Sequence, residues 1–431
     1  MDDSDSLNIN INAPKGARFI LDRIRDAGYE AYFVGGCVRD RLLGREPGDW
    51  DITTSALPCQ VKELFSSTVD TGIKHGTVMV LYGGVGYEVT TYRIDGQYHD
   101  GRHPDSVQFT PSLEEDLKRR DFTINAFAYE PEDGIVDLFG GLDDLRAHVV
   151  RAVGDPCRRF SEDALRIMRA VRFAAQLSFE IEKNTEEAIS SFAGNLSLVS
   201  AERIRVEFEK TLLSDNPAYV NKYRELGLAP YIISNVWDKC FREDSAGVYK
   251  NIKSMYDGDA KILMLAEFFK CLTYEECSDV MKRMTYDNDT RAAVCDILRL
   301  EKRENDAAGY EKMSASADTG GYSERNKKDK YDDIHIRKML KYAGEDAVRG
   351  FFELAHARGA DMSYAIRGLE LILKRGDAYK VTMLDINGCD LMSAGIEKGK
   401  EIGTVLNMLL DKVIEDPALN DKEILLEMIK R

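Results

Sequence analysis

The sequence predicts an α+β fold, with a mixed β-sheet and its helices in the first third of the chain and helices throughout the rest. Two observations support this prediction. Short β-branched runs punctuated by glycine occur before residue 150, at 77–82, 87–92 and 107–109. From Ser161 onward almost every segment has helical periodicity, and the alternation typical of strands disappears.

The composition is that of a soluble globular protein with several domains. The chain has 431 residues, of which 44% are hydrophobic and 31% are charged. No apolar run approaches the roughly 20 residues that a membrane span needs. The acidic N-terminus argues against a secretory signal. The eight cysteines are scattered without a CxxC pair, which favours reduced thiols and a cytoplasmic location.

The charge balance restricts the kind of nucleic-acid partner. The net charge is −16 and the isoelectric point is near 5.0, which argues against broad, non-specific binding to nucleic acids. An RNA partner stays possible if the basic residues gather locally, and composition does not decide the question.

The stretch from Phe33 to Thr54 predicts a strand, a glycine turn, a helix, a second turn and a second strand. Asp49 and Asp51 stand at i and i+2 of that second strand, so we expect both on one face, with Trp50 pointing into the opposite layer. Two carboxylates on one face form a hard-oxygen site suited to Mg²⁺. The alternative interpretation is two solvated acids beside a turn.

The glycine turn that precedes these acids could form the phosphate side of the same site. Gly35 and Gly36 let backbone N–H groups approach a phosphate at a helix N-terminus, although they could merely end a strand. Arg39, one helical turn further, could bond a ribose or phosphate, or could simply pair with Asp40. Pro58 opens a further predicted helix at 57–65.

A second cluster is RRDFTINA, residues 119–126, in a pattern that reads as helical from Leu113 onward and is capped by Ser112. The functional interpretation places Arg120 against a triphosphate, because its planar donor fork suits phosphate oxygens. The alternative is a surface cluster that caps the local helix.

A third cluster is SEDALRIMRAVRF, residues 161–173, with Ser161 as an expected N-cap. Asp163 and Arg166 stand at i and i+3, so we expect their side chains to be neighbours. An acceptor-only Asp beside a donor-only Arg matches cytosine and adenine and rejects uracil and guanine; a plain intrahelical ion pair is the alternative. Arg169 and Arg172 continue the series, and Arg172 is expected to orient its neighbours or to meet RNA.

These patterns predict a division of the chain into five segments. The first domain is expected at 1–150, and it includes a polar loop at 93–105. Helical segments are expected at 151–213, 214–302 and 333–431. Residues 303–332, rich in Gly, Ser, Asp and Lys, are expected to form a linker or flexible insert.

Four motifs stand in one order: GGCVRD at 35–40, GDWDITT at 48–54, RRDFTINA at 119–126 and EDALRIMRAVRF at 162–173. A fifth, SAERIRVEFEK, follows at 200–210. Together they resemble the class II tRNA nucleotidyltransferases, which comprise the bacterial CCA-adding enzymes and their poly(A) polymerase relatives. The resemblance covers roughly residues 20–215. It implies a polymerase-β-like nucleotidyltransferase head followed by an all-helical neck, body and tail.

The resemblance also implies roles for individual residues. Asp49 and Asp51 would be catalytic and would bind Mg²⁺. The nucleotide would be held by Gly36, Arg39 and Arg120. In the neck, Asp163 and Arg166 would recognise the base of CTP or ATP, with Arg169 and Arg172 in support. The tail would bind the acceptor and T arm of tRNA. No membrane or DNA partner is expected.

The activity implied is untemplated addition of C, C and A to the tRNA 3′ end, with release of pyrophosphate. The loop at 93–105 looks full length, which favours complete CCA addition, although His103 stands where an arginine more usually precedes the proline. The alternatives are an A-adding enzyme or poly(A) polymerase with the same site, a non-catalytic RNA-binding protein on the same scaffold, and a small-molecule nucleotidyltransferase. The long helical remainder favours a large substrate over the last of these.

Overall fold

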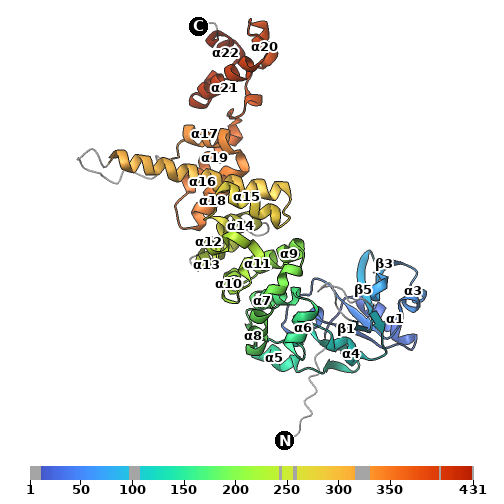
Figure 1. Ribbon diagram of the computed structural model, residues 1–431. Helices are drawn as coiled ribbons and strands as arrows, with labels where there is room; N and C mark the ends of the chain where they lie inside the picture. Colours follow the sequence, from blue (N-terminus) through green and yellow to red (C-terminus); the bar gives the residue numbers. More distant parts are fainter. Residues whose placement is uncertain are drawn as a thin grey trace. The chain divides into compact units, whose positions relative to one another are not determined.

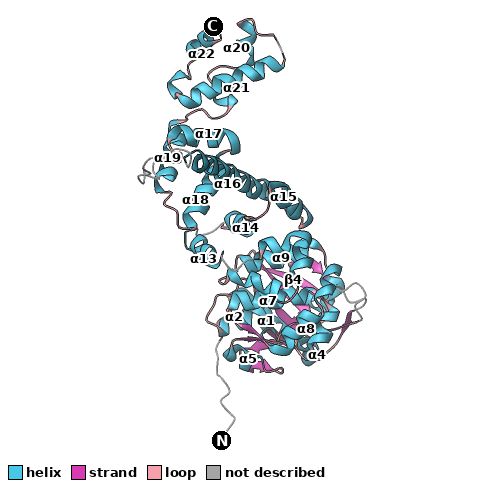
Figure 2. Ribbon diagram, turned by 60° about the vertical axis from the view of Figure 1, so that its left-hand side comes forward, coloured by secondary structure: helices cyan, strands magenta, loops and turns pink. Residues whose placement is uncertain are grey.

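The computed structural model describes residues 11–96, 107–241, 245–255, 260–315, 331–397 and 399–429 (Figure 1). The chain divides into two compact units, residues 1–237 and 238–431. The first unit contains the β-sheet and the second consists of helices in its described part, in agreement with the predicted fold class (Figure 2). Among the described helices, none combines the length and the apolar character that a bilayer crossing would require.

The first unit is built on a mixed seven-stranded sheet with the strand order β3-β4-β5-β2-β1-β8-β9. Strands β2 and β5 are parallel, and every other neighbouring pair is antiparallel. The two β-branched runs expected at 77–82 and 87–92 are confirmed as the antiparallel strands β4 and β5. The strands are β1 (Ala31–Val34), β2 (Ile52–Thr54), β3 (Thr68–Gly72), β4 (Thr77–Tyr82), β5 (Val85–Thr91), β8 (Phe127–Glu130) and β9 (Gly134–Asp137).

Helices surround this sheet and continue after it. The helix expected at 57–65 is confirmed as α3. The helices of this unit are α1 (Lys15–Asp26), α2 (Gly36–Leu42), α3 (Pro58–Leu64), α4 (Leu113–Lys118), α5 (Gly141–Ala147), α6 (Pro156–Glu162), α7 (Leu165–Leu177), α8 (Lys183–Ser191), α9 (Ala201–Leu212), α10 (Lys222–Glu225) and α11 (Ala229–Ile233). Helix α12 (Trp237–Cys240) lies at the boundary between the units.

Three local predictions are corrected. The helix that begins at Leu113 ends at Lys118, and Phe127–Glu130 is strand β8. All four residues of β8 are buried, so its sequence lacks the alternation of a half-exposed strand and resembles that of a buried helix. The loop expected from residue 93 begins with strand β6 (Arg93–Asp95), which pairs with β7 (Val107–Phe109); residues 97–106, including His103, lie outside the described residues. The helical part after residue 161 also contains β11 (Glu180–Ile181), paired with β10 (Val149–Val150).

The second unit includes two apolar clusters formed by residues from its later described helices. Ile336, Phe352 and Leu369 belong to one, and Leu391, Leu409 and Val413 belong to the other. The helices are α13 (Ala246–Met255), α14 (Lys261–Phe269), α15 (Tyr274–Arg283), α16 (Asn288–Ala315), α17 (Asp333–Ala343), α18 (Glu345–Ala357), α19 (Ser363–Arg375), α20 (Gly388–Ser393), α21 (Lys400–Glu415) and α22 (Lys422–Met428).

The segment expected as a linker at 303–332 requires a correction. Helix α16 continues from Asn288 to Ala315, so the first thirteen residues of the expected linker are helical. The physical reason is that Glu, Lys, Arg and Ala, which dominate this stretch, are good helix formers even without an apolar face. Residues 316–330 lie outside the described residues.

Candidate active site

The two acids of the GDWDITT motif lie directly before strand β2. The strand begins at Ile52, so the prediction that both acids stand within it is corrected. The extended chain nevertheless reaches back to Asp51, whose carbonyl accepts a 3.1 Å hydrogen bond from Val34 N–H. Trp50 is buried and its ring lies 5.1 Å from that of Phe33, while Asp49 is exposed and Asp51 is partly exposed. Trp50 therefore anchors the segment and leaves the two carboxylates on its outer side.

A third carboxylate lies on the neighbouring strand. Ile52 pairs with Val89 in the parallel register of β2 and β5, which places Asp51 next to Glu88. Burial raises the pKa of Asp51 to about 6, and the negative charges of Asp49 and Glu88 add to this shift, while Arg120 opposes it. The sequence alone suggests Glu88 as a possible third carboxylate on the neighbouring strand without assigning it as a ligand, and the strand pairing brings it beside Asp51. Nowhere in the described part do three His, Cys, Asp or Glu side chains form a ready-made metal cluster.

The turn before α2 needs a glycine. Gly35 has φ +78° and ψ −127°, a conformation that side chains disfavour. A Cβ at this position would also lie 3.0 Å from Nη1 of Arg120. The glycine turn and Arg120 are therefore packed against each other, as the sequence interpretation of a common phosphate side requires.

Arg39 is buried and has several partners within the protein. Its Nε and Nη2 donate to Asp40 Oδ1 at 2.9 and 2.7 Å, and its Nη1 donates to Asn125 Oδ1. The guanidinium also lies 5.1 Å from the centre of the Phe173 ring. Of the two interpretations offered by the sequence, pairing with Asp40 is the one observed, and contact with a nucleotide stays a prediction.

Asp116 is fully buried on α4 and organises the two arginines of the RRDFTINA motif. Its Oδ1 accepts bonds from Arg119 at 2.8 and 3.0 Å, and its Oδ2 lies 3.4 Å from Arg120 Nη2. Thr53 Oγ1 donates to Oδ2 at 3.1 Å. Burial opposes the ionised form, but Arg119 and Arg120 hold the pKa of Asp116 below its usual range. Sequence reasoning missed Asp116, because an acid on an amphipathic helix carries no signal of burial.

Arg120 keeps donor capacity in this arrangement. Within the described structure its buried Nε has no hydrogen-bond partner, and its single contact with Asp116 is long. About a fifth of its side chain is exposed. Arg120 therefore stands beside Asp51 and the glycine turn with N–H groups available for an anionic ligand.

Asp121, in the RRDFTINA motif, is the centre of a hydrogen-bond network. Its Oδ2 accepts from Arg169 Nε at 2.8 Å, and its Oδ1 accepts from Phe122 N–H at 2.8 Å and Asn125 Nδ2 at 3.1 Å. Burial opposes the ionised form, but Arg169 and these hydrogen bonds hold the pKa of Asp121 well below its usual range. Asn125 also accepts from Arg39, so one network joins α2, the turn after α4 and α7.

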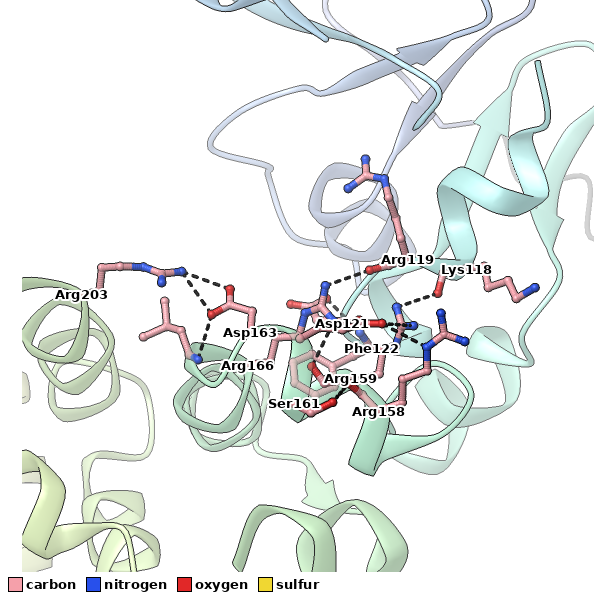
Figure 3. Close-up of polar contacts among 12 residues, drawn as sticks. Lys118, Arg119, Asp121, Phe122, Arg158, Arg159, Ser161, Asp163, Arg166 and Arg203 are labelled. Atoms are coloured by element: carbon pink, nitrogen blue, oxygen red, sulfur yellow. Dashed lines mark hydrogen bonds and ion pairs between the residues drawn. The ribbon is translucent and has the colours of Figure 1, made fainter. Parts of the chain in front are cut away.

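The Asp163–Arg166 prediction is corrected in its geometry. Ser161 lies inside α6, and Asp163 stands in an extended conformation between α6 and α7. Its Oδ1 accepts from Leu165 N–H at 3.0 Å, and its carboxylate pairs with Arg203 at 3.1 Å (Figure 3). The two residues are therefore not an ion pair within one helix, because the chain is not helical at Asp163: Arg166 N–H donates to the Asp163 carbonyl at 3.0 Å, and the Asp163 carboxylate pairs with Arg203 instead.

Arg166 lies on the other side of this break and points toward the head. Its Nη1 donates to the Arg159 carbonyl at 3.1 Å and to Glu162 Oε2 at 2.8 Å. Its Nη2 donates to the Arg119 carbonyl at 3.0 Å, a contact visible in Figure 3. Arg166 thus ties the RRDFTINA segment to α6 and α7.

Arg172 is buried and turned toward α9. Its Nε donates to Glu207 Oε2 at 2.5 Å and its Nη1 donates to Gln176 Oε1 at 2.7 Å. Its guanidinium stacks 3.9 Å from the centre of the Phe173 ring. Between the two predicted roles, these contacts favour orienting neighbouring residues over meeting RNA.

Comparison with known proteins places these residues in a family. Residues 31–151 match the Poly A polymerase head domain, 178–240 match the probable RNA and SrmB-binding site of polymerase A, and 379–429 match a putative tRNA nucleotidyltransferase domain 2. The CCA-adding enzyme of Ligilactobacillus salivarius (strain UCC118) is 41% identical over 97% of this chain and 96% of its own length. That of Limosilactobacillus fermentum is 39% identical over 95% of each chain.

Solved structures that resemble this chain belong to the same family as these relatives. The crystal structure of the Bacillus stearothermophilus CCA-adding enzyme in complex with CTP superposes with a TM-score of 0.78 at 31% identity, covering 97% of each chain. The Thermotoga maritima CCA-adding enzyme, complexed with tRNA, has a TM-score of 0.64 at 23% identity, which establishes likeness of fold. The fold class and the family resemblance inferred from the five motifs are both confirmed.

Proposed function

Because the chain belongs to the family of CCA-adding enzymes, we propose that it adds C, C and A to the 3′ end of tRNA without a nucleic-acid template. CTP and ATP are the substrates. The 3′ oxygen of the tRNA forms a bond to the α-phosphorus, the bond between the α-phosphorus and the bridging oxygen breaks, and pyrophosphate leaves. The observation that carries the proposal is the convergence of Asp51, Asp49 and Arg120 beside the Gly35 turn.

The family implies a divalent cation, and the donor set fits Mg²⁺. Asp49 and Asp51 offer hard oxygen ligands on the outer side of one segment, where burial raises the pKa of Asp51 and the charges of Asp49 and Glu88 raise it further. Mg²⁺ bound by these two carboxylates would polarise the α-phosphate and increase the acidity of the attacking hydroxyl.

The phosphate side of the site is assigned to three residues. Arg120 offers N–H donors to the triphosphate, since its contact with Asp116 is long, at 3.4 Å, and about a fifth of its side chain is exposed. Gly36 begins α2 and gives the phosphates close access to the backbone. Arg39, held by Asp40 and Asn125, borders the nucleotide and fixes the position of α2 against the network around Asp121.

Base choice is assigned to the neck. Asp163 accepts hydrogen bonds and Arg166 donates them, which matches the amino group and ring nitrogen shared by cytosine and adenine. Because Arg166 already donates to the Arg119 and Arg159 carbonyls, it reaches the base with its remaining N–H groups. Arg169 and Arg172 support the pair through Asp121 and Glu207.

Partner and location follow from the same proposal. The tRNA acceptor and T arm would bind to the helical tail, proposed at 333–431. The neck and body stay proposed at 151–213 and 214–302, although helix α16 continues past residue 302. A cytoplasmic location is consistent with the cysteines, all eight of which are free thiols.

An A-adding enzyme or poly(A) polymerase is the second candidate for the function, since it would use the same acids. A non-catalytic RNA-binding protein has no need of paired acids beside the phosphates that it must attract.

The decisive experiment uses full-length protein, tRNA transcripts ending at position 73, and radiolabelled CTP or ATP. We expect three added nucleotides when both are present, two with CTP and none with ATP. Addition of A to tRNA ending in CC, without addition of C, would identify an A-adding enzyme, and long A tails on unstructured RNA would identify a poly(A) polymerase. No incorporation on any acceptor would overturn the proposal.

A further inference from the structure

The fifth motif, SAERIRVEFEK, enters the function proposed above only through Glu207, yet a second of its side chains reaches a residue of the base site. We infer that Arg203 is a positioning residue that holds the Asp163 carboxylate in the orientation needed for base choice. The inference rests on the proposed function, because it concerns how that enzyme would select CTP and ATP.

Asp163 needs an outside partner because of its place in the chain. It stands between α6 and α7 with φ −137°, where the backbone is extended, and no helix fixes its side chain. One oxygen, Oδ1, accepts the Leu165 N–H at 3.0 Å. Arg203 Nη2 lies 3.1 Å from Oδ2 and 3.4 Å from Oδ1, as Figure 3 shows. The two contacts together restrain both oxygens of the carboxylate.

Helix α9, which carries Arg203, is itself fixed against α7. One turn further along α9, Glu207 is buried and accepts from Arg172 Nε at 2.5 Å. Ile204 and Phe208 are buried on the same helix. Arg203 therefore projects from a rigid support, and its side chain, 21% exposed, meets the 17% exposed side chain of Asp163 at the edge of the packed helices.

The chemistry of base choice explains why this contact matters. Asp163 rejects uracil and guanine only while its carboxylate is ionised and accepts hydrogen bonds. Arg203 occupies one side of the carboxylate, which leaves the remaining lone pairs for the amino group of cytosine or adenine. Without Arg203 the Asp163 carboxylate is free to turn. Discrimination between cytosine or adenine and the other bases then weakens, while Asp49 and Asp51 stay unchanged.

The test compares Arg203→Gln, Arg203→Lys and the unaltered enzyme on tRNA ending at position 73. Arg205→Gln is the matched control, because Arg205 lies on the same helix and its carboxylate contact is with Glu209, at 3.4 Å, outside the base site. For Arg203→Gln we expect KM for CTP and ATP to rise about tenfold, with kcat changed less than about twofold, as for loss of one charge-assisted hydrogen bond. Misincorporation of UMP relative to CMP should rise by a similar factor, and Arg203→Lys should restore part of both.

A double-mutant cycle with Asp163→Asn separates positioning from general stability. If Arg203 acts through Asp163, Arg203→Gln should add little to the effect of Asp163→Asn on KM and on UMP misincorporation. Equal, additive effects in both backgrounds would overturn the inference. So would unchanged KM and fidelity in Arg203→Gln, provided that the unaltered enzyme adds CCA. If the unaltered enzyme adds nothing, the proposed function fails instead.

Discussion

Thr53 Oγ1 donates a 3.1 Å hydrogen bond to Asp116 Oδ2, and this bond joins the strand that follows the two acids to the helix that precedes the two arginines. Asp116 has no exposed surface and also accepts from Arg119 and Arg120. A single buried carboxylate thus sets the distance between the proposed metal side and the proposed phosphate side of the site.

Removal of this carboxylate should destabilise the first unit. Asp116→Ala leaves two guanidinium groups without their shared partner, so we expect the free energy of unfolding to fall by about 3 kcal/mol. Glu115→Ala is the control, because Glu115 lies on the same helix with an exposed side chain and pairs only weakly with Lys118. Urea unfolding followed by circular dichroism measures both, and equal losses for the two variants would contradict the prediction.

The same substitution should have a pH-dependent effect. The pKa of Asp116 is lower in the folded protein than in the unfolded chain, so its contribution is fully present above the unfolded pKa of about 4. The contribution is lost as pH falls through the lower, folded value. The difference in unfolding free energy between the unaltered protein and Asp116→Ala should therefore be constant from pH 7 to 5 and shrink on further acidification. A difference that stays constant down to pH 2 would show that Asp116 contributes by packing.

Alanine at Gly35 should harm activity beyond its effect on stability. Alanine at this position would have to adopt a backbone conformation that side chains disfavour, which costs about 1–3 kcal/mol. Its Cβ would also push Arg120 away from the turn. Gly44→Ala is the matched control, because Gly44 also has positive φ but its Cβ would meet nothing within 4 Å. We expect kcat/KM for CTP to fall by roughly tenfold or more in Gly35→Ala. In Gly44→Ala it should stay near that of the unaltered enzyme, and equal activities in the two variants would refute the close packing of Arg120.

Removal of divalent cations should abolish incorporation. EDTA should stop addition to tRNA, and excess Mg²⁺ should restore it in the unaltered protein. In Asp49→Ala and Asp51→Ala we expect incorporation to stay lower by roughly 100-fold or more at every Mg²⁺ concentration. Asp143→Asn, at an exposed acid on α5, should respond as the unaltered protein does. Full incorporation by Asp51→Ala would refute the assignment of the metal side.

The local features of the site could be predicted from contiguous residues. The strand, glycine turn and helix at 31–42, the hairpin at 77–91 and the burial of Trp50 between two outward acids all follow from periodicity within a few residues. Where a break in periodicity was not visible, the prediction was wrong. Asp163 and Arg166 were expected side by side on one helix, but the helix is interrupted at Asp163.

The sequence by itself determined the family, the two acids of the proposed metal side and the order of sheet and helices, because each depends on short motifs or local hydrogen-bond patterns. Only the tertiary structure decided the partners: Arg203 for Asp163, Glu207 for Arg172, and Asp116 for Arg120. The first two pairs join residues 40 and 35 positions apart. Such contacts depend on how helices pack, and a buried acid in a sequence looks the same as an exposed one until packing removes it from water.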